Sequence, residues 1–147
     1  MLAAQDDDAG ARGIEFLPWS NLKTVHDGLE LVETAGHPAG GLIIDVWHTE
    51  RAHTPPADLA NVPLSRFIGV ELNDADSQVV GTLFEDTVRR RRLCGDGTFD
   101  LSGVVTALRT VGWTGPWGVE ILSDAHRALP VRDAVDAAYR TAVAALT

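Results

Sequence analysis

The segment that most constrains this fold is Gly-Leu-Ile-Ile-Asp-Val-Trp-His at residues 41–48, where an acid stands inside an apolar run. Residues 42–47 are predicted to form a strand buried on both faces, as in parallel sheets covered by helices. Asp45 then lies near the carboxyl end of that strand, the edge at which α/β proteins bind ligands. A buried carboxylate is costly unless it is paired, protonated or metal-bound. Asp45 is therefore either a site residue or the cap of a following turn.

Three further acids stand in apolar segments that read Gly-x-Glu: Glu15, Glu71 and Glu120. Side chains alternate along a strand, so each Glu shares a face with the Gly two residues earlier, while the residue between them points the other way. One face of the predicted sheet is thus narrow and carries glycines and acids, and the other carries branched apolar side chains. Four acids that converge in a place of low dielectric repel one another without a cation. The sequence therefore predicts a divalent metal site made by Glu15, Asp45, Glu71 and Glu120.

Strands alternate with helices along the chain. Strands are predicted at 13–17, 42–47, 67–72 and 117–122, and helices at about 21–35, from Asp100 to Gly112, and after Pro130. Such alternation is typical of parallel βαβ units with right-handed crossovers. Residues 1–12 are predicted to be a flexible lead-in to a single domain at 13–147, and the segment 73–98 shows no periodicity and is predicted to be a lid or substrate loop.

Composition narrows the range of partners. A net charge of −9 and a pI near 4.8 argue against nucleic acid or an anionic membrane as the main partner. The exception is the run Arg89–Arg92, which is either a solvated helix end or loop, or a holder of a substrate carboxylate or phosphate. A single Cys94 fits a reducing compartment. There is no signal-like start and no run long enough to span a bilayer, so we expect a cytoplasmic protein.

Five motifs occur in order: Glu15-Phe16-Leu17-Pro18, Asp45-Val46-Trp47-His48, Leu72-Asn73-Asp74-Ala75, Gly95-Asp96-Gly97 and Gly118-Val119-Glu120. Together they resemble the C-terminal half of the xylose-isomerase-like barrels, the sugar phosphate isomerase/epimerase superfamily, from about residue 13 onward. The resemblance implies a fold of four consecutive βα units, half of a (β/α)8 TIM barrel. It also implies a divalent cation at the barrel mouth. Related enzymes include ketose epimerases, sugar isomerases, inosose dehydratase and 3-dehydroshikimate dehydratase.

The resemblance also implies roles for individual residues. The metal ligands would be Glu15, Asp45, Glu71 and Glu120. Of these, Glu15 and Glu120 would also serve as catalytic acid/base groups. His48 would bind a substrate hydroxyl or oxyanion, and Arg91 would bind the far end of the substrate. The match around Arg91 is looser, because Cys94 stands where the family has Pro. Trp19 and Trp47 follow acid-bearing strands and are candidates to wall a substrate pocket.

Glu71 departs from the pattern, because relatives usually place His or Gln there. A ligand set made only of carboxylates favours the hard ions Mn²⁺ or Mg²⁺, with Zn²⁺ or Co²⁺ as further options. Alternatively, Glu71 stays protonated or metal affinity is lost.

The expected function is a metal-dependent isomerase or epimerase of a carbohydrate-like substrate, acting through an enediolate. The alternatives are a dehydratase of the same superfamily, of the 3-dehydroshikimate or inosose type, and a non-catalytic half-barrel interaction module. A complete barrel has eight strands, and this chain supplies four. We therefore expect a homodimer, a partner chain or a missing N-terminal segment to complete it.

Overall fold

One parallel sheet organises the molecule. The computed structural model describes residues 10–147, in which β1 (Arg12–Glu15), β2 (Gly40–Asp45), β3 (Phe67–Leu72) and β4 (Trp117–Val119) lie side by side in chain order. This confirms the predicted α/β architecture of four consecutive βα units. Of the predicted lead-in, residues 1–9 lie outside the described residues, and Arg12 already belongs to β1.

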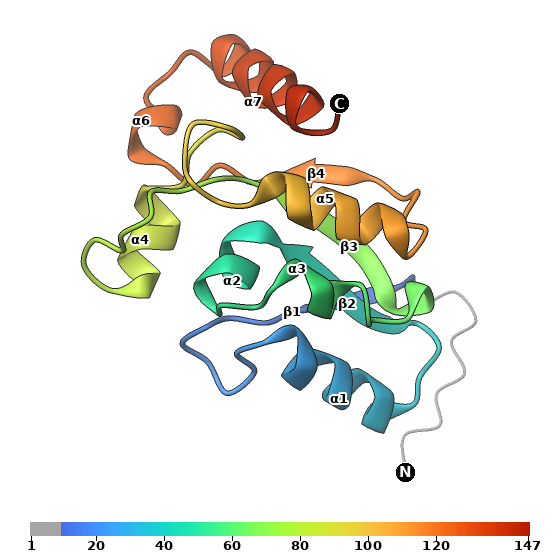
Figure 1. The fold of residues 1–147 in the computed structure, drawn as a ribbon. Coiled ribbons are helices and arrows are strands. Elements are labelled where there is room, and N and C mark those ends of the chain that lie inside the picture. Colours follow the sequence, from blue (N-terminus) through green and yellow to red (C-terminus); the bar gives the residue numbers. More distant parts are fainter. Residues whose placement is uncertain (1–9) are drawn as a thin grey trace.

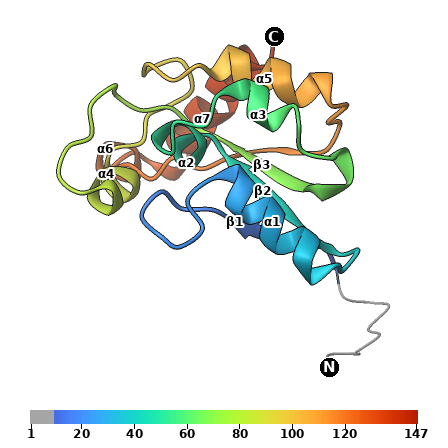
Figure 2. The same cartoon turned by 60° about the horizontal axis from the view of Figure 1, so that its bottom comes forward.

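Helices connect the strands and cover one side of the sheet. They are α1 (Val25–Ala35), α2 (Val46–Arg51), α3 (Pro56–Leu59), α4 (Leu83–Arg89), α5 (Leu101–Thr110), α6 (Asp124–Arg127) and α7 (Val131–Ala145), with a 3₁₀ turn at Leu64–Arg66. The helices α1, α3 and α5 lie along one face of the sheet, and α7 lies beyond β4 (Figure 1). The short helices α2, α4 and α6 gather at the end of the sheet where the strands finish (Figure 2). None of the helices described in residues 10–147 is long and apolar enough to cross a membrane.

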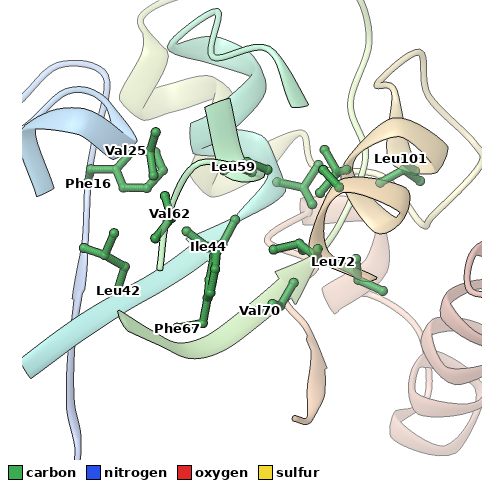
Figure 3. Packing of buried hydrophobic residues seen from close by; sticks show 14 of the residues in the cluster. Phe16, Val25, Leu42, Ile44, Leu59, Val62, Phe67, Val70, Leu72 and Leu101 are labelled. Carbon is green, nitrogen blue, oxygen red and sulfur yellow. The ribbon is translucent and has the colours of Figure 1, made fainter. Parts of the chain in front are cut away.

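The hydrophobic core lies between the sheet and these helices (Figure 3). Leu42, Ile44, Val70 and Leu72 point from the two central strands into this layer and are almost fully buried. They pack with residues of the helices and loops that include Phe16, Val25, Leu59, Val104 and Leu108. Burying each such side chain stabilises the fold by roughly 1.5–3 kcal/mol. Of the residues predicted to face the helices, Val70 lies in this core and Ile14 packs against it, whereas Val119 is 36% exposed.

Glycines shape the opposite, inner face of the sheet. A Cβ added to Gly13 would lie 2.5 Å from Cγ1 of Ile43, and Gly69 is the cross-strand partner of Ile43 on its other side. The small residues thus leave room for one branched side chain beneath the acids. The inner face is narrow, as predicted, because Ile43 fills the space that glycine leaves.

The strands predicted at 13–17 and 117–122 end at Glu15 and Val119, and two further predicted segments differ more. The strand predicted at 42–47 ends at Asp45, and Val46 and Trp47 begin α2, because the Asp45 side chain accepts the backbone N–H of His48 as an N-cap. The segment 73–98 is not an irregular loop, since it contains α4. The Thr82 side chain accepts the N–H of Glu85, and the Glu85 carboxylate accepts the N–H of Thr82, which is a complete capping box.

A buried carboxylate ties the rest of that segment to the sheet. Asp74, two residues beyond the end of β3, accepts backbone N–H groups from Ala75, Gly95, Gly97 and Phe99. A Cβ at Gly97 would collide with the Asp74 carboxylate and the carbonyl oxygen of Ala75. The predicted Gly95-Asp96-Gly97 turn is therefore held in one place by Asp74.

Candidate functional site

The four acids predicted to form a metal site lie together at the carboxyl edge of the sheet. Glu15 ends β1, Asp45 ends β2, Glu71 lies in β3, and Glu120 follows β4. The strand register places Asp45 directly beside Glu71. One carboxylate oxygen from each acid lies within 4.8 Å of the others. The fold thus brings together side chains from three strands and from the residue that follows the fourth.

Asp45 is the most buried of the four, with 0% of its surface exposed. Its Oδ1 accepts the backbone N–H of His48 at 3.3 Å and Nδ2 of Asn73 at 3.1 Å, and its Oδ2 lies 2.5 Å from Nη1 of Arg91. A buried carboxylate is tolerated when donors of this kind surround it. Asp45 is therefore both a helix cap and a member of the acidic cluster.

Among the described residues, Arg91 supplies a positive charge to the site, and it is only 2% exposed. Its Nη1 donates to Asp45 and lies 2.9 Å from Oε2 of Glu120. The hydroxyl of Thr87 accepts from Nε at 3.0 Å and from Nη2 at 2.8 Å, which fixes the plane of the guanidinium. The solvated interpretation of the arginine run is therefore wrong for Arg91, whereas its exposed neighbours pair with Asp76, with Asp124 and with the buried Asp86.

His48 lies in the first turn of α2, and its side chain is 4% exposed. Its Nε2 is 3.1 Å from Oε1 of Glu15 and 3.3 Å from Nη2 of Arg91. Its Nδ1 has no hydrogen-bond partner among the described residues. The imidazole therefore faces the acidic cluster between a carboxylate and a guanidinium.

Aromatic rings surround this imidazole. Trp19 packs edge-on against His48 and Trp47, with ring centroids 5.5 and 5.9 Å apart, and is 38% exposed. Trp47 is fully buried, and the guanidinium carbons of Arg51 and Arg91 lie 5.5 and 5.8 Å from its ring centroid. Of the two predicted wall residues, only Trp19 therefore has surface to offer a substrate, while Trp47 supports the site from behind.

Three neighbours of the cluster escaped the sequence reasoning. Asn73 holds Asp45, Thr87 holds Arg91, and the exposed Phe84 packs against Trp19 with ring centroids 6.2 Å apart. Phe84 and Thr87 both lie on α4. The Thr82-x-x-Glu85 capping signature could have revealed that helix, whereas nothing in the local sequence marks Asn73 as a partner of Asp45.

Burial and neighbouring negative charges raise the pKa values of two of the carboxyls. Burial, followed by the nearby charges of Glu120, Asp45 and Glu15, raises the pKa of Glu71 to about 7. Burial also raises the pKa of Glu120, although the Arg91 guanidinium acts in the opposite direction. Burial is thus the main cause of the raised pKa at both carboxyls, and neighbouring negative charges add to it.

The raised pKa of Glu71 predicts a pH-dependent stability for the metal-free chain. The folded pKa of about 7 exceeds the ordinary glutamate value of 4.5, so Glu71 costs no stability below pH 4.5 and a growing amount as the pH rises to about 7. Glu71→Gln should therefore raise the melting temperature by a few degrees at about pH 8, and by much less at about pH 5. Thermal unfolding in a chelator checks this, and an equal effect at both pH values would contradict it.

The donor atoms fit a divalent cation in two overlapping sets. Glu15, Asp45, Glu71 and Glu120 form one set, and Glu15, Asp45 and His48 form the other, each with ligand atoms within 4.8 Å of one another. Carboxylate oxygens suit Mg²⁺ and Mn²⁺, and a set that includes imidazole also suits Zn²⁺ or Co²⁺. The residues present therefore fit the metal that the acid pattern predicts.

Comparison with known proteins finds relatives of larger size. The chain is 31% identical over 131 residues to a 3-dehydroshikimate dehydratase of Pseudomonas putida and 32% identical over 126 residues to one of Pseudomonas aeruginosa. These matches cover 86% and 84% of this chain but 20% of each relative. An inosose isomerase of Halalkalibacterium halodurans is 25% identical over 132 residues, which is 88% of this chain and 46% of that protein.

Solved structures share the fold. A crystal structure of the IOLI protein with a binding zinc atom superposes with a TM-score of 0.85 at 22% identity, covering 92% of this chain and 49% of that one. A fusion of a xylose isomerase-like TIM barrel with 4-hydroxyphenylpyruvate dioxygenase gives 0.82 at 29% identity, covering 89% and 21%. The family model described as "Xylose isomerase-like TIM barrel" matches residues 8–142. The chain therefore belongs to the xylose isomerase-like TIM barrel family, of which it contains four βα units.

Proposed function

We propose that the complete protein is a divalent-metal-dependent enzyme that removes a proton next to a carbonyl group of a small, hydroxylated, carbohydrate-like substrate. The observation that carries this proposal is the convergence of four carboxyls, one imidazole and one arginine at the carboxyl edge of a parallel sheet. Acid/base groups and a cation in one place are what abstraction of such a proton requires.

Each residue has a role in this proposal. Glu15 and Asp45 belong to both donor sets and would hold the cation, which supplies polarisation of the substrate carbonyl when bound. Glu120, whose pKa burial raises, would take the proton, because a base with a pKa nearer neutrality is better matched to the task. Glu15 would return a proton on the other side of the substrate. Arg91 would bind an anionic or hydroxyl oxygen at the substrate's far end, and Trp19 would form a wall of the pocket.

What happens after proton removal decides the reaction class. Loss of a neighbouring hydroxyl as water gives a dehydratase, whereas return of a proton gives an isomerase or epimerase. The two relatives above 30% identity are 3-dehydroshikimate dehydratases, which favours dehydration. The inosose isomerase relative supports the isomerase as the second candidate.

Activity in this proposal belongs to the assembled barrel. The chain spans 20% of the two dehydratases and 46% of the inosose isomerase, and its sheet has four of the eight strands of a TIM barrel. The remaining strands would come from a second copy, a partner chain or a longer form of the same chain. The pocket is then shaped partly by residues outside these four units.

The assay follows both outcomes at once. Assembled protein loaded with Mn²⁺ is incubated in D₂O with 3-dehydroshikimate or with a ketose, and mass spectrometry records loss of water and gain of deuterium. Loss of water from 3-dehydroshikimate supports the dehydratase, and deuterium gain in the ketose without loss of water supports the isomerase. Absence of both, with metal bound, would leave the non-catalytic interaction module as the better account.

A further inference from the structure

The proposed chemistry gives no role to Arg51, a buried cation at the end of α2. Its side chain is 8% exposed, and its guanidinium carbon lies 5.5 Å from the ring centroid of Trp47 and 5.0 Å from that of Phe99. A buried charge is tolerated only when it has an opposite charge and hydrogen-bond acceptors around it. The partners of Arg51 therefore show what this side chain holds in place.

The acceptors of Arg51 lie in the segment that leads into α4. Its Nη2 donates to the carbonyl oxygen of Asp76 at 2.7 Å and to Oδ2 of Asp86 at 3.1 Å, and its Nη1 donates to the carbonyl oxygen of Ser77 at 3.2 Å. The Asp86 carboxylate is 2% exposed and also accepts the backbone N–H of Val80 at 3.1 Å. One guanidinium thus ties the end of α2 to the start of this segment and to the first turn of α4.

Polar contacts, more than apolar packing, hold α4 against the rest of the molecule. The buried side chains of α4 are those of Asp86 and Thr87, whereas the apolar Phe84 is 59% exposed. Just beyond the helix, the backbone N–H of Arg91 donates to the carbonyl oxygen of Leu122 at 3.1 Å and attaches that end. The ion pair with α2 is the attachment near the other end, so it sets how the helix lies.

Thr87 connects this ion pair to the acidic cluster. It follows Asp86 in α4, and its hydroxyl accepts from Nε and Nη2 of Arg91. The Nη1 of Arg91 in turn pairs with Asp45 and Glu120. Because an arginine side chain is long and its fork is planar, the guanidinium recognises oxygen atoms well only when its plane is fixed. A shift of Thr87 would release that plane.

We propose that Arg51 is a positioning residue of the site: its ion pair with Asp86 docks α4, and the docked Thr87 then holds the guanidinium of Arg91 in place. Among the described residues, Arg51 pairs with Asp86 and with none of the four acids of the cluster, so it acts through Thr87. The inference rests on the proposed function for the contact between Arg91 and substrate, whereas the geometry that it predicts is measurable in the chain itself.

Nuclear magnetic resonance of the guanidinium of Arg91 tests the geometry without any need for activity. Its Nε–H donates to the Thr87 hydroxyl, so its proton–nitrogen correlation signal should exchange slowly with solvent, and Thr87→Val identifies the signal. We expect Asp86→Asn and Arg51→Met to speed up this exchange by at least about tenfold, because opening of α4 exposes the group. Arg51→Lys, which keeps a charge beside Asp86, should restore part of the protection.

The matched control is Arg66→Met. It removes a guanidinium that donates to the carbonyl oxygens of His37 and Gly40, at the amino end of β2. The exchange of the Arg91 signal should not change. If Arg51→Met does not fold, the isosteric Asp86→Asn decides in its place.

Kinetics separates positioning from stability. In the assembled, Mn²⁺-loaded protein with 3-dehydroshikimate, Arg51→Met should raise KM by at least about tenfold and lower kcat by a smaller factor, because Arg91 is assigned to the far end of the substrate. The effects of Arg51→Met and Thr87→Val on KM should not add, because both act through the same guanidinium. A residue that only stabilises the fold would lower the melting temperature and leave KM unchanged.

The outcomes separate this inference from the proposed function. An Arg91 signal whose exchange is unchanged in Asp86→Asn and Arg51→Met, or additive effects on KM, would overturn the positioning role and leave the proposed function standing. A protected signal that these variants release, in a protein that transforms neither 3-dehydroshikimate nor a ketose, would support the positioning of Arg91 and contradict the proposed function.

Discussion

Glu120→Gln in the assembled, Mn²⁺-loaded protein should lower the rate of substrate proton exchange by about 10²–10⁴-fold, the usual contribution of a positioned general base. The amide keeps the volume of the side chain but can neither take a proton nor carry the charge that pairs with Arg91 2.9 Å away. The loss should appear in kcat, because the base acts in the transition state. Deuterium incorporation measured by mass spectrometry gives the rate.

The fold should survive this change. Glu120 is only partly buried and follows the end of β4, so near-ultraviolet circular dichroism should match that of the natural chain. Glu33→Gln, the same change at an exposed position of α1, serves as the control and should keep full activity. If Glu120→Gln retained more than about a tenth of kcat, a loss below about 1.4 kcal/mol, Glu120 would not be the base.

The second large effect concerns assembly, because the sheet has open edges and α7 has an open apolar face. β1 and β4 each pair with one strand only, so each leaves a row of backbone groups unpaired in the described residues. The apolar face predicted for α7 is mostly uncovered, with Val135 64% and Tyr139 68% exposed. A cavity of about 500 Å³ between α7 and β4 is lined by these two residues together with Val119, Ile121, His126, Arg127, Leu129, Val131, Ala134 and Ala138.

We therefore expect the chain to associate, with β4 of one copy beside β1 of another, which closes eight parallel strands with two-fold symmetry. Burial of one Val or Tyr side chain stabilises such a contact by roughly 2 kcal/mol, or a factor of about 30 in the dissociation constant. Val135→Lys should shift sedimentation velocity profiles from dimer to monomer. Leu64→Lys, at an exposed apolar residue of the 3₁₀ turn Leu64–Arg66, should leave the profile unchanged. A compact natural monomer with native near-ultraviolet circular dichroism would contradict the expectation.

The strands and the acidic cluster could be predicted because local pattern determines both. Branched residues such as Val70 had to face helices, and Glu71, one position later, had to face the other way. The same reasoning misplaced Val46 and Trp47, because an apolar run does not show whether a strand continues or a helix begins. The deciding feature is the hydrogen bond from the His48 backbone to Asp45, a capping signal three residues apart.

Contacts between distant segments could not be predicted in this way. Arg91 was singled out by its motif, but its pairing with Asp45 joins residues that are 46 positions apart. The sequence also could not predict how much of α7 is buried, because helical periodicity shows which face is apolar but not what covers that face. Tyr139 lies on that face and is exposed, since no described residue packs over it fully.

Metal binding is the claim on which the account depends most directly. Isothermal titration of the chelator-treated chain with Mn²⁺ should show one ion bound per chain. Binding should be lost in Glu15→Gln and in Asp45→Asn, the two carboxylates common to both donor sets, and kept in the Glu33→Gln control. Binding that is absent in the natural chain, or equally strong in Glu15→Gln and Asp45→Asn, would contradict a metal centre at the carboxyl edge of this sheet.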